Sequence, residues 1–315
     1  MRRHRLQRNW GARVHETKLA GLDAVVLENA RLRVTVLAGK GGDIVELNYK
    51  PRDLDFAWLS PGGVRDPRTL SGDAADPLAG FMESYPGGWQ EVLPNGGVPG
   101  SQAGASYGQH GEVALVPWDH EIVRDGEDGV TVRLEVALRT VPLRVVKDLS
   151  LDRETAELRV AETLTNESDE PVAVMWGHHV VFGRPFLRPG WRLELPVDAP
   201  GLETIPEPGG PSDIHYLSGF GDQGSYTISG DGIGMHVRWD ARTMPYLWVW
   251  RELGATRTYP WWGRAYVVGL EPFSSHPTGG LAEAVRNGTA LRLEPREHRS
   301  FDLSAAVRDT RQGPV

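Results

Sequence analysis

Short segments in which apolar and polar residues alternate recur along most of the chain. The clearest are residues 130–138, 143–151 and 156–164. Successive side chains of a β-strand point to opposite faces of the sheet, so this pattern predicts strands with one buried face. Few windows carry apolar residues at the spacing of an amphipathic helix. The sequence therefore predicts an all-β protein, built as a sandwich or a barrel.

Further short strands are expected on both sides of these segments, separated by turns rich in Gly, Pro, Asn and Asp. They are expected at residues 24–27, 32–37, 44–49, 172–181, 192–195, 226–228, 235–239, 246–250, 265–270, 290–293 and 300–303. No linker of Pro, Ser and Gly separates two such groups, so residues 1–315 are predicted to form a single domain.

Residues 60–108 interrupt the alternation and are rich in Gly, Pro, Asp and Ser. A weakly structured segment of this length inside a compact domain is usually functional. It contains the run from Gly87 to Gly97, where glycines allow a close approach of the backbone to a ligand or simply make turns.

Composition limits the classes of function. The 315 residues are 40% apolar and 24% charged, which is typical of a soluble globular protein. The net charge of -8 comes from mixed acids and bases, and the absence of a basic stripe argues against nucleic-acid or anionic-membrane partners. No apolar region follows the basic residues at the start, and no window resembles a membrane span, so the cytoplasm is the expected compartment.

Several chemistries lack their sequence signals. Without cysteine the chain has no disulfide, no thiolate nucleophile and no Cys-ligated zinc. It also lacks a dinucleotide-binding glycine motif, a Walker loop, an HExxH motif and a GxSxG elbow. Nucleotide cofactors and serine hydrolysis therefore have no support. We also expect no bound metal, a small molecule as partner, and a monomer or homodimer.

Two adjacent histidines, His178 and His179, end an apolar run and are the leading candidates for chemistry. On a strand they point to opposite faces, so at most one of them faces a given cleft and a metal site built on the pair is disfavoured. Histidine can hold or release a proton near neutral pH.

Glu271 and His110 are the candidate partners of this histidine pair. Glu271 ends an alternating segment just before Pro272, which stops or bends the strand. A carboxylate there can accept a proton at pH 7. His110 follows the glycine-rich segment and precedes Gly111, where an exposed loop histidine is the alternative interpretation.

The chain has 11 tryptophans, whose flat faces can pack on the C–H face of a sugar ring or simply fill the core. For Trp176 a core position is the safer assignment. Candidate substrate contacts are His178, Trp89, Glu91, Asn95, Trp176 and Trp262, with Trp261 as another stacking platform.

These residues together resemble the motifs of the galactose mutarotase (aldose 1-epimerase) superfamily, in order and in approximate spacing over nearly the whole chain. The motifs are Leu27-Glu28-Asn29 through Leu37, Gly41-Gly42, His110-Gly111 with Pro117-Trp118, Gly177-His178-His179-Val180-Val181-Phe182, Leu270-Glu271-Pro272 and Gly280-Leu281-Ala282-Glu283-Ala284. His179 is in register with the catalytic histidine of that superfamily and Glu271 with its catalytic glutamate.

The resemblance implies a β-supersandwich, two large antiparallel sheets that are packed and curved around a sugar cleft. It also implies a cofactor-free interconversion of the α and β anomers of an aldose. Glu271 would take the proton from the C1 hydroxyl and His179 would protonate the ring oxygen. His110 would bind the ring and share in positioning or acid catalysis.

Departures from the superfamily leave the sugar open. Asn95 is followed by Gly96 and Gly97, where an arginine is common, and Val181 stands where a tyrosine is common. The substrate-binding aspartate has no clear counterpart, although Asp213 and Asp222 are possible. Two alternatives therefore stand beside the mutarotase hypothesis: a non-catalytic carbohydrate-binding or sensing protein, and a supersandwich lyase acting on oligosaccharides.

Overall fold

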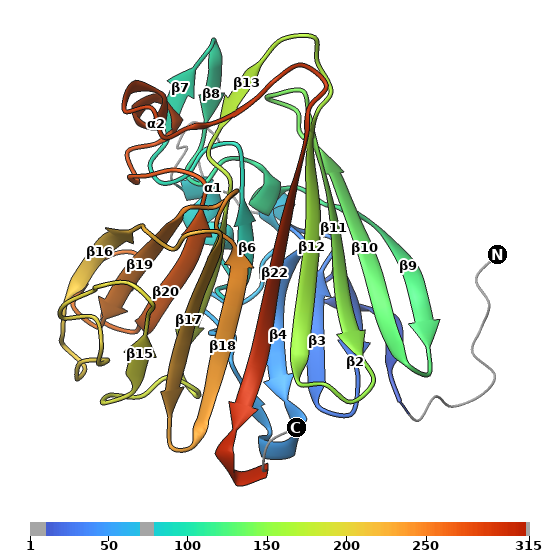
Figure 1. Cartoon of the computed structure of the whole chain (residues 1–315), viewed down its shortest axis with the longest axis vertical. Helices are drawn as coiled ribbons and strands as arrows, with labels where there is room; N and C mark the ends of the chain where they lie inside the picture. The colour runs from blue at the N-terminus through green and yellow to red at the C-terminus, as the bar shows by residue number, and fades with distance from the viewer. Residues whose placement is uncertain (1–10, 70–78, 313–315) are drawn as a thin grey trace.

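The computed structural model describes residues 11–69 and 79–312, and these residues form two large antiparallel sheets that pack face to face (Figure 1). The two α-helices among them are short, α1 (Ala79–Ser84) and α2 (Leu281–Arg286). Single 3-10 turns lie at η1 (Lys50–Arg52), η2 (Pro67–Thr69), η3 (Val113–Leu115) and η4 (Thr310–Gln312). No helix in these described ranges is long and apolar enough to cross a membrane. The prediction of an all-β antiparallel protein is confirmed.

The larger sheet has ten strands. Their spatial order is β1 (Arg13–Leu19), β2 (Leu22–Glu28), β3 (Leu32–Leu37), β4 (Asp43–Tyr49), β6 (Trp89–Val92), β14 (Gly177–Gly183), β20 (Tyr266–Phe273), β19 (Tyr246–Leu253) and β16 (Ser212–Leu217), with β5 (Leu54–Asp55) paired to β4. Strands that are far apart in sequence, β6, β14 and β20, therefore lie side by side at its centre.

The smaller sheet has eight strands and runs across the front of Figure 1. Their order is β15 (Arg192–Glu194), β17 (Gln223–Gly230), β18 (Ile233–Asp240), β22 (His298–Asp309), β12 (Glu157–Asn166), β11 (Leu143–Asp152), β10 (Gly129–Ala137) and β9 (Asp119–Gly126). Two further pairs are separate from both sheets, β7 (Gly100–Gln102) with β8 (Ala105–Tyr107), and β13 (Val172–Val174) with β21 (Leu291–Leu293).

The structure corrects two sequence-based expectations. Residues 172–181 form two strands instead of one, because the backbone between them turns aside: Met175 donates its N–H to Pro94 O and Trp176 donates its N–H to Ser274 Oγ. The segment 60–108, expected to be weakly structured, contains β6, a central strand that pairs with β14 from Gly177↔Val92 to Val180↔Trp89.

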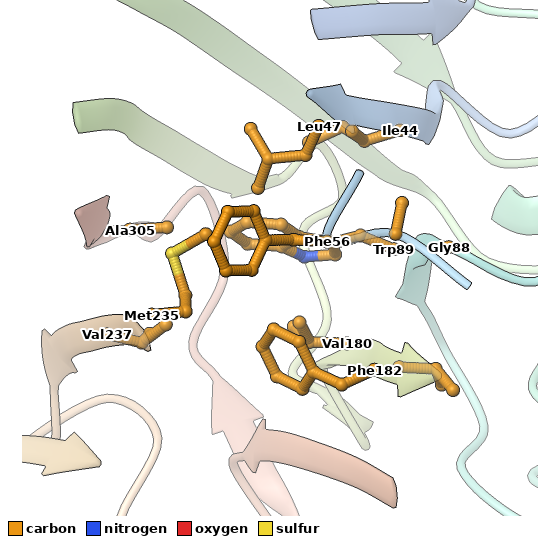
Figure 2. A pocket seen from close by; sticks show the side chains of 12 residues that line it. Ile44, Leu47, Phe56, Gly88, Trp89, Val180, Phe182, Met235, Val237 and Ala305 are labelled. Carbon is orange, nitrogen blue, oxygen red and sulfur yellow. The ribbon is translucent and has the colours of Figure 1, made fainter. Parts of the chain in front are cut away.

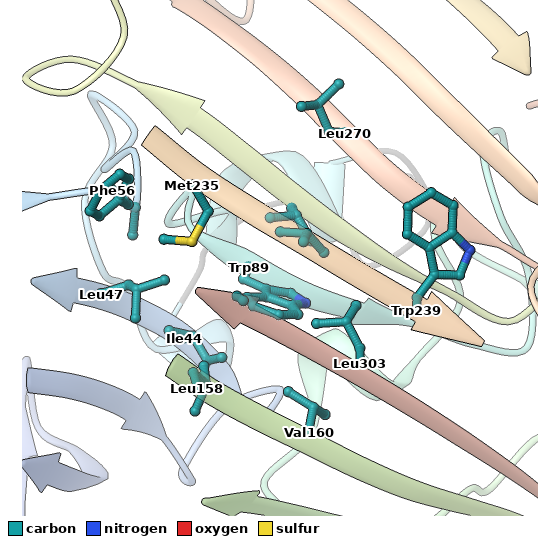
Figure 3. Packing of buried hydrophobic residues seen from close by; sticks show 14 of the residues in the cluster. Ile44, Leu47, Phe56, Trp89, Leu158, Val160, Met235, Trp239, Leu270 and Leu303 are labelled. Atoms are coloured by element: carbon teal, nitrogen blue, oxygen red, sulfur yellow. The ribbon is translucent and has the colours of Figure 1, made fainter. Parts of the chain in front are cut away.

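The main core fills the space between the two sheets. Trp89 of β6, Val160 of β12 and Leu303 of β22 belong to one apolar cluster, which is drawn in Figure 3. A small void near Phe56, Phe182 and Met235 is lined by apolar side chains and has a volume of about 10 Å³ (Figure 2). A water molecule needs at least that much room and polar partners, so this void is a feature of core packing.

Candidate active site

Strand alternation decides which side chains leave the core. On β14, His178, Val180 and Phe182 face the smaller sheet, where the His178 ring stacks on Phe301 of β22 at 5.2 Å between centroids. His179 therefore points to the other face of the larger sheet, where its ring lies 5.6 Å from that of Trp250. On β20 the same alternation buries Leu270 in the main core and turns Glu271 to the side of His179.

His179 and Glu271 meet on this outer face. His179 Nε2 lies 3.6 Å from Glu271 Oε1, and the His110 ring lies 5.3 Å from the His179 ring. The three residues predicted to do chemistry line one cavity of about 240 Å³, although they are far apart in sequence. Their roles in that cavity remain a prediction.

The His110 ring is fixed by the loop that carries it. His110 has a positive φ of 57° and donates its N–H to Gly97 O at 3.1 Å. Gly97 donates its own N–H to His110 Nδ1 at 3.3 Å. Because Nδ1 accepts this bond, the proton of the neutral ring is on Nε2, which leaves His110 a hydrogen-bond donor.

Asn95 holds the same loop in place and is not free to bind a sugar. Its Nδ2 donates to Val98 O at 2.9 Å and to Gly108 O at 3.0 Å, and its Oδ1 accepts the N–H of Leu281 at 2.7 Å. The prediction that Asn95 contacts substrate is therefore corrected, because backbone groups use both ends of its amide.

Burial favours the uncharged forms of the reactive groups. It raises the pKa of Glu271 well above its ordinary value and lowers the pKa of His179 to about 4. Burial, and then the neighbouring His179, lower the pKa of His110 well below its ordinary value. Burial therefore favours a neutral imidazole at His179 and a protonated carboxyl group at Glu271.

Aromatic and aliphatic side chains form much of the cavity wall. Its aromatic members are Phe81, Tyr85, Trp248, Trp250 and Trp261. Sequence analysis missed Trp248 and Trp250 as site residues, although residues two apart on a strand share a face and could have been assigned together. Tyr85, whose OH lies 3.4 Å from His179 Nδ1, gave no such signal, because it lies in a nonperiodic segment.

Four of the predicted substrate contacts lie on the core side of the larger sheet, away from the cavity, and this placement corrects their assignment. Glu91 binds Lys147 Nζ at 3.0 Å and accepts the indole N–H of Trp176 at 2.9 Å. Trp89 donates its indole N–H to His178 Nδ1, so neutral His178 donates from Nε2 to Glu162 at 3.0 Å. These side chains are buried between the sheets.

The remaining candidates lie at the edge of the site or outside it. Trp262 is 61% exposed, whereas its neighbour Trp261 lines the cavity. Asp213 is paired with Arg251 at 2.7 Å and Asp222 lies in a groove on the smaller sheet, so neither lines the cavity. In residues 11–69 and 79–312 no group of three or more potential ligands is arranged to hold a metal ion.

Comparisons with known proteins place this geometry in a family. A search of curated proteins finds no match. The sequence model of a family described as "Domain of unknown function (DUF4432)" matches residues 19–204 and 225–307. The chain belongs to this family.

The DUF4432 chain is also similar to solved structures. A provisionally assigned aldose 1-epimerase from Klebsiella pneumoniae has a TM-score of 0.79 and 18% identity over 96% of this chain and 89% of its own. A galactose mutarotase-like protein from Clostridium acetobutylicum has a TM-score of 0.68 and 12% identity, covering 95% and 99% of the two chains. A galactose mutarotase related enzyme from Lactobacillus acidophilus has a TM-score of 0.60 and 17% identity, covering 91% and 98%.

These likenesses establish the fold. The DUF4432 chain has the galactose mutarotase-like fold, which confirms the predicted β-supersandwich and the resemblance read from its motifs. Identities below 20% carry no activity from one protein to another, because one fold supports many functions.

Proposed function

We propose that this protein is a cofactor-independent isomerase that interconverts the α and β anomers of an uncharged monosaccharide. The observation that carries the proposal is the juxtaposition of His179 and Glu271, 3.6 Å apart in a cavity lined by aromatic side chains. Anomer exchange needs one group that takes a proton from O1 and another that gives a proton to the ring oxygen.

A pair that shares one proton is suited to this exchange. With the proton on His179, the Glu271 carboxylate removes the proton from the C1 hydroxyl while His179 protonates the ring oxygen. The C1–O5 bond then breaks and leaves an open-chain aldehyde. Rotation about the C1–C2 bond presents the other face of the carbonyl carbon. Ring closure returns both protons, so the pair ends as it began.

His110 and the tryptophans have supporting roles in this proposal. The Nε2–H of His110 donates a hydrogen bond to the ring or to a hydroxyl group, since its Nδ1 is occupied by Gly97. Trp250 and Trp261 offer flat apolar faces to the C–H side of a sugar ring.

The size and charge of the cavity favour an uncharged single sugar. Its 240 Å³ is below the roughly 300–1,000 Å³ of sites that hold larger ligands. Its described lining includes neither lysine nor arginine to pair with an anion. These observations favour a monosaccharide over the oligosaccharide that a lyase would take, and a neutral sugar over a phosphorylated one.

Anomer-exchange NMR with neutral aldoses and hexose phosphates tests the proposal. The wild type should accelerate exchange of at least one neutral aldose, and Glu271→Gln and His179→Ala should each lower kcat/KM by about a hundredfold or more. Far-UV circular dichroism of both variants should match that of the wild type.

The outcomes separate the candidate functions. Sugar binding without faster exchange would indicate the carbohydrate-binding alternative, and cleaved oligosaccharide products would indicate the lyase. Exchange at wild-type rates in both variants would remove the proposed roles of His179 and Glu271. Glu252→Gln is a matched control, because this carboxylate is also buried on β19 but binds Thr256 outside the cavity.

A further inference from the structure

Tyr85 brings a hydroxyl group to the reactive histidine. Its side chain lines the cavity and is almost fully buried, and its hydroxyl oxygen lies 3.4 Å from His179 Nδ1. The other ring nitrogen of His179, Nε2, lies 3.6 Å from Glu271 Oε1. Each nitrogen of the imidazole therefore faces one polar side chain, Tyr85 at Nδ1 and Glu271 at Nε2.

The Tyr85 ring is held in place by its neighbours. It stacks on the ring of Phe81 at 5.3 Å between centroids, and the rings of Trp58 and Trp261 each lie 6.1 Å away. Its backbone carbonyl accepts a hydrogen bond from Ser60 Oγ at 2.7 Å. A side chain that is fixed by such packing can in turn orient a reactive group that it touches.

The proposed proton exchange determines where the neutral imidazole carries its own proton. The Glu271 carboxyl group can give a proton to His179 Nε2 only while Nε2 has a lone pair, so the ring proton is then on Nδ1. There it faces the Tyr85 hydroxyl oxygen, which is able to accept it. Burial raises the pKa of Tyr85 well above its ordinary value, so this hydroxyl group stays uncharged.

We propose that Tyr85 is a positioning residue, which accepts the Nδ1–H of His179 and so keeps Nε2 turned toward Glu271 and free to take a proton. The inference rests on the proposed function, since it concerns the step in which that proton moves. The distance of 3.4 Å is long for a hydrogen bond, as is common in active sites before substrate binds.

The contact with Tyr85 can persist through the whole proton exchange. When Glu271 gives its proton to Nε2, the carboxyl group becomes a carboxylate and His179 becomes an imidazolium that still carries the Nδ1 proton. When the Nε2–H bond then breaks and the proton passes to the ring oxygen of the sugar, the neutral imidazole returns with its proton on Nδ1. Tyr85 exchanges no proton in either step, so it acts only by orienting His179.

Long-range proton–nitrogen NMR of the full-length, nitrogen-15-labelled protein without sugar measures the tautomer directly, because protonated and unprotonated ring nitrogens differ in chemical shift. The signals that disappear in His179→Ala belong to this ring. At pH 7 the wild type should hold the Nδ1–H tautomer. In Tyr85→Phe, which keeps the ring and removes the hydroxyl group, the ratio of the Nδ1–H to the Nε2–H tautomer should fall about fivefold, the effect of one lost hydrogen bond.

Anomer-exchange NMR gives a second readout. Tyr85→Phe should lower kcat about tenfold and change KM by less than about twofold, because the hydroxyl group acts on His179 and does not bind the sugar. Tyr266→Phe is the matched control. Tyr266 is also buried and its hydroxyl group donates to Pro206 O at 2.6 Å, but it does not line the cavity. This variant should keep the wild-type kcat and the wild-type tautomer of His179.

The Nε2–H tautomer in the wild type, or an unchanged tautomer ratio in Tyr85→Phe, would overturn the inference. A higher KM with an unchanged kcat would also overturn it, because the hydroxyl group would then bind the sugar instead of orienting His179. If the wild type accelerates no anomer exchange, the proposed function fails, and the tautomer ratios still decide whether Tyr85 orients His179.

Discussion

Burial shifts the pKa values of His179 and Glu271 in opposite directions. Both shifts have the same effect, because each favours the uncharged form of its group. Burial lowers the pKa of His179 to about 4, which favours the neutral imidazole, and raises the pKa of Glu271, which favours its protonated carboxyl group. The two groups are 3.6 Å apart, and their titrations belong to the pair. The pair is competent for proton exchange only while it holds a single proton.

We therefore expect a bell-shaped dependence of kcat/KM on pH. Below about pH 4, His179 is protonated and the pair holds two protons. The rate falls because no group remains to act as the base. Above the raised pKa of Glu271 the shared proton is lost, no acid remains, and the rate falls again. Each limb should approach a tenfold change per pH unit, with a plateau between the pKa of His179 and the raised pKa of Glu271.

Anomer-exchange NMR across the pH range, with the uncatalysed rate subtracted at each value, measures this profile. A rate that declines steadily as the pH falls through neutrality would contradict it. That result would mean that Glu271 must lose its proton outright before the reaction proceeds.

Sequence alone identified the three titratable residues that the fold brings together, because their motifs occur in a recognisable order. It failed for Trp89, Glu91 and Trp176, which a composition rich in aromatics and acids made attractive. Which face of the sheet a side chain takes depends on how its strand is placed in the fold. The side chains of Trp89 and Trp176 belong to the main core between the sheets, and Glu91 binds Lys147 there.

At the scale of the element, the strands with long alternation were predictable and the short ones were not. Residues 130–138 show the pattern of β10 directly, since one face is buried and the other is half-exposed. Strand β6 is four residues long and buried on both faces, so it has no alternation to read. Its conformation is decided by pairing with β14 and β4, which lie far from it in the sequence.

The loop that follows β6 is also an element of the site, and Asn95 is its anchor. Asn95→Ala removes three hydrogen bonds, so we expect a loss of about 1–3 kcal/mol in the free energy of unfolding. Displacement of His110 should also lower kcat/KM by about tenfold or more. Urea unfolding and anomer-exchange NMR measure the two effects.

Asn166→Ala is the matched control. Asn166 is also buried, and its Nδ2 lies within hydrogen-bond distance of the carbonyl oxygens of Glu170, Leu293 and Glu294, none of which lines the cavity. We expect a similar loss of stability and an unchanged kcat/KM per folded molecule. Equal loss of activity in both variants would show that Asn95 acts through general stability and not through the loop.

At the scale of the whole molecule, the chain passes repeatedly between the sheets. Strands β9 to β12 build the smaller sheet, β14 joins the larger one, β17 and β18 return to the smaller one, and β19 and β20 complete the centre of the larger one. Sequence patterns predicted the strands but left a sandwich and a barrel open. Local periodicity cannot make this choice, because it does not encode which distant strands pair. The order of the motifs made it, through the resemblance to a family with a sandwich fold.

Because the chain passes repeatedly between the two sheets, we expect them to unfold together. That residues 1–315 form one domain remains a prediction. Neither sheet can keep its apolar face buried if the other unfolds, since the main core takes residues from both.

We therefore expect a single unfolding transition in urea, with the same midpoint by tryptophan fluorescence, by far-UV circular dichroism and by loss of sugar binding. Among the tryptophans of the described residues, Trp89 and Trp239 lie in the main core and Trp250 lines the cavity, so fluorescence samples both regions. Two separated transitions, with the larger sheet or the cavity lost first, would mean that the sheets are independently stable and that the single-domain prediction is wrong.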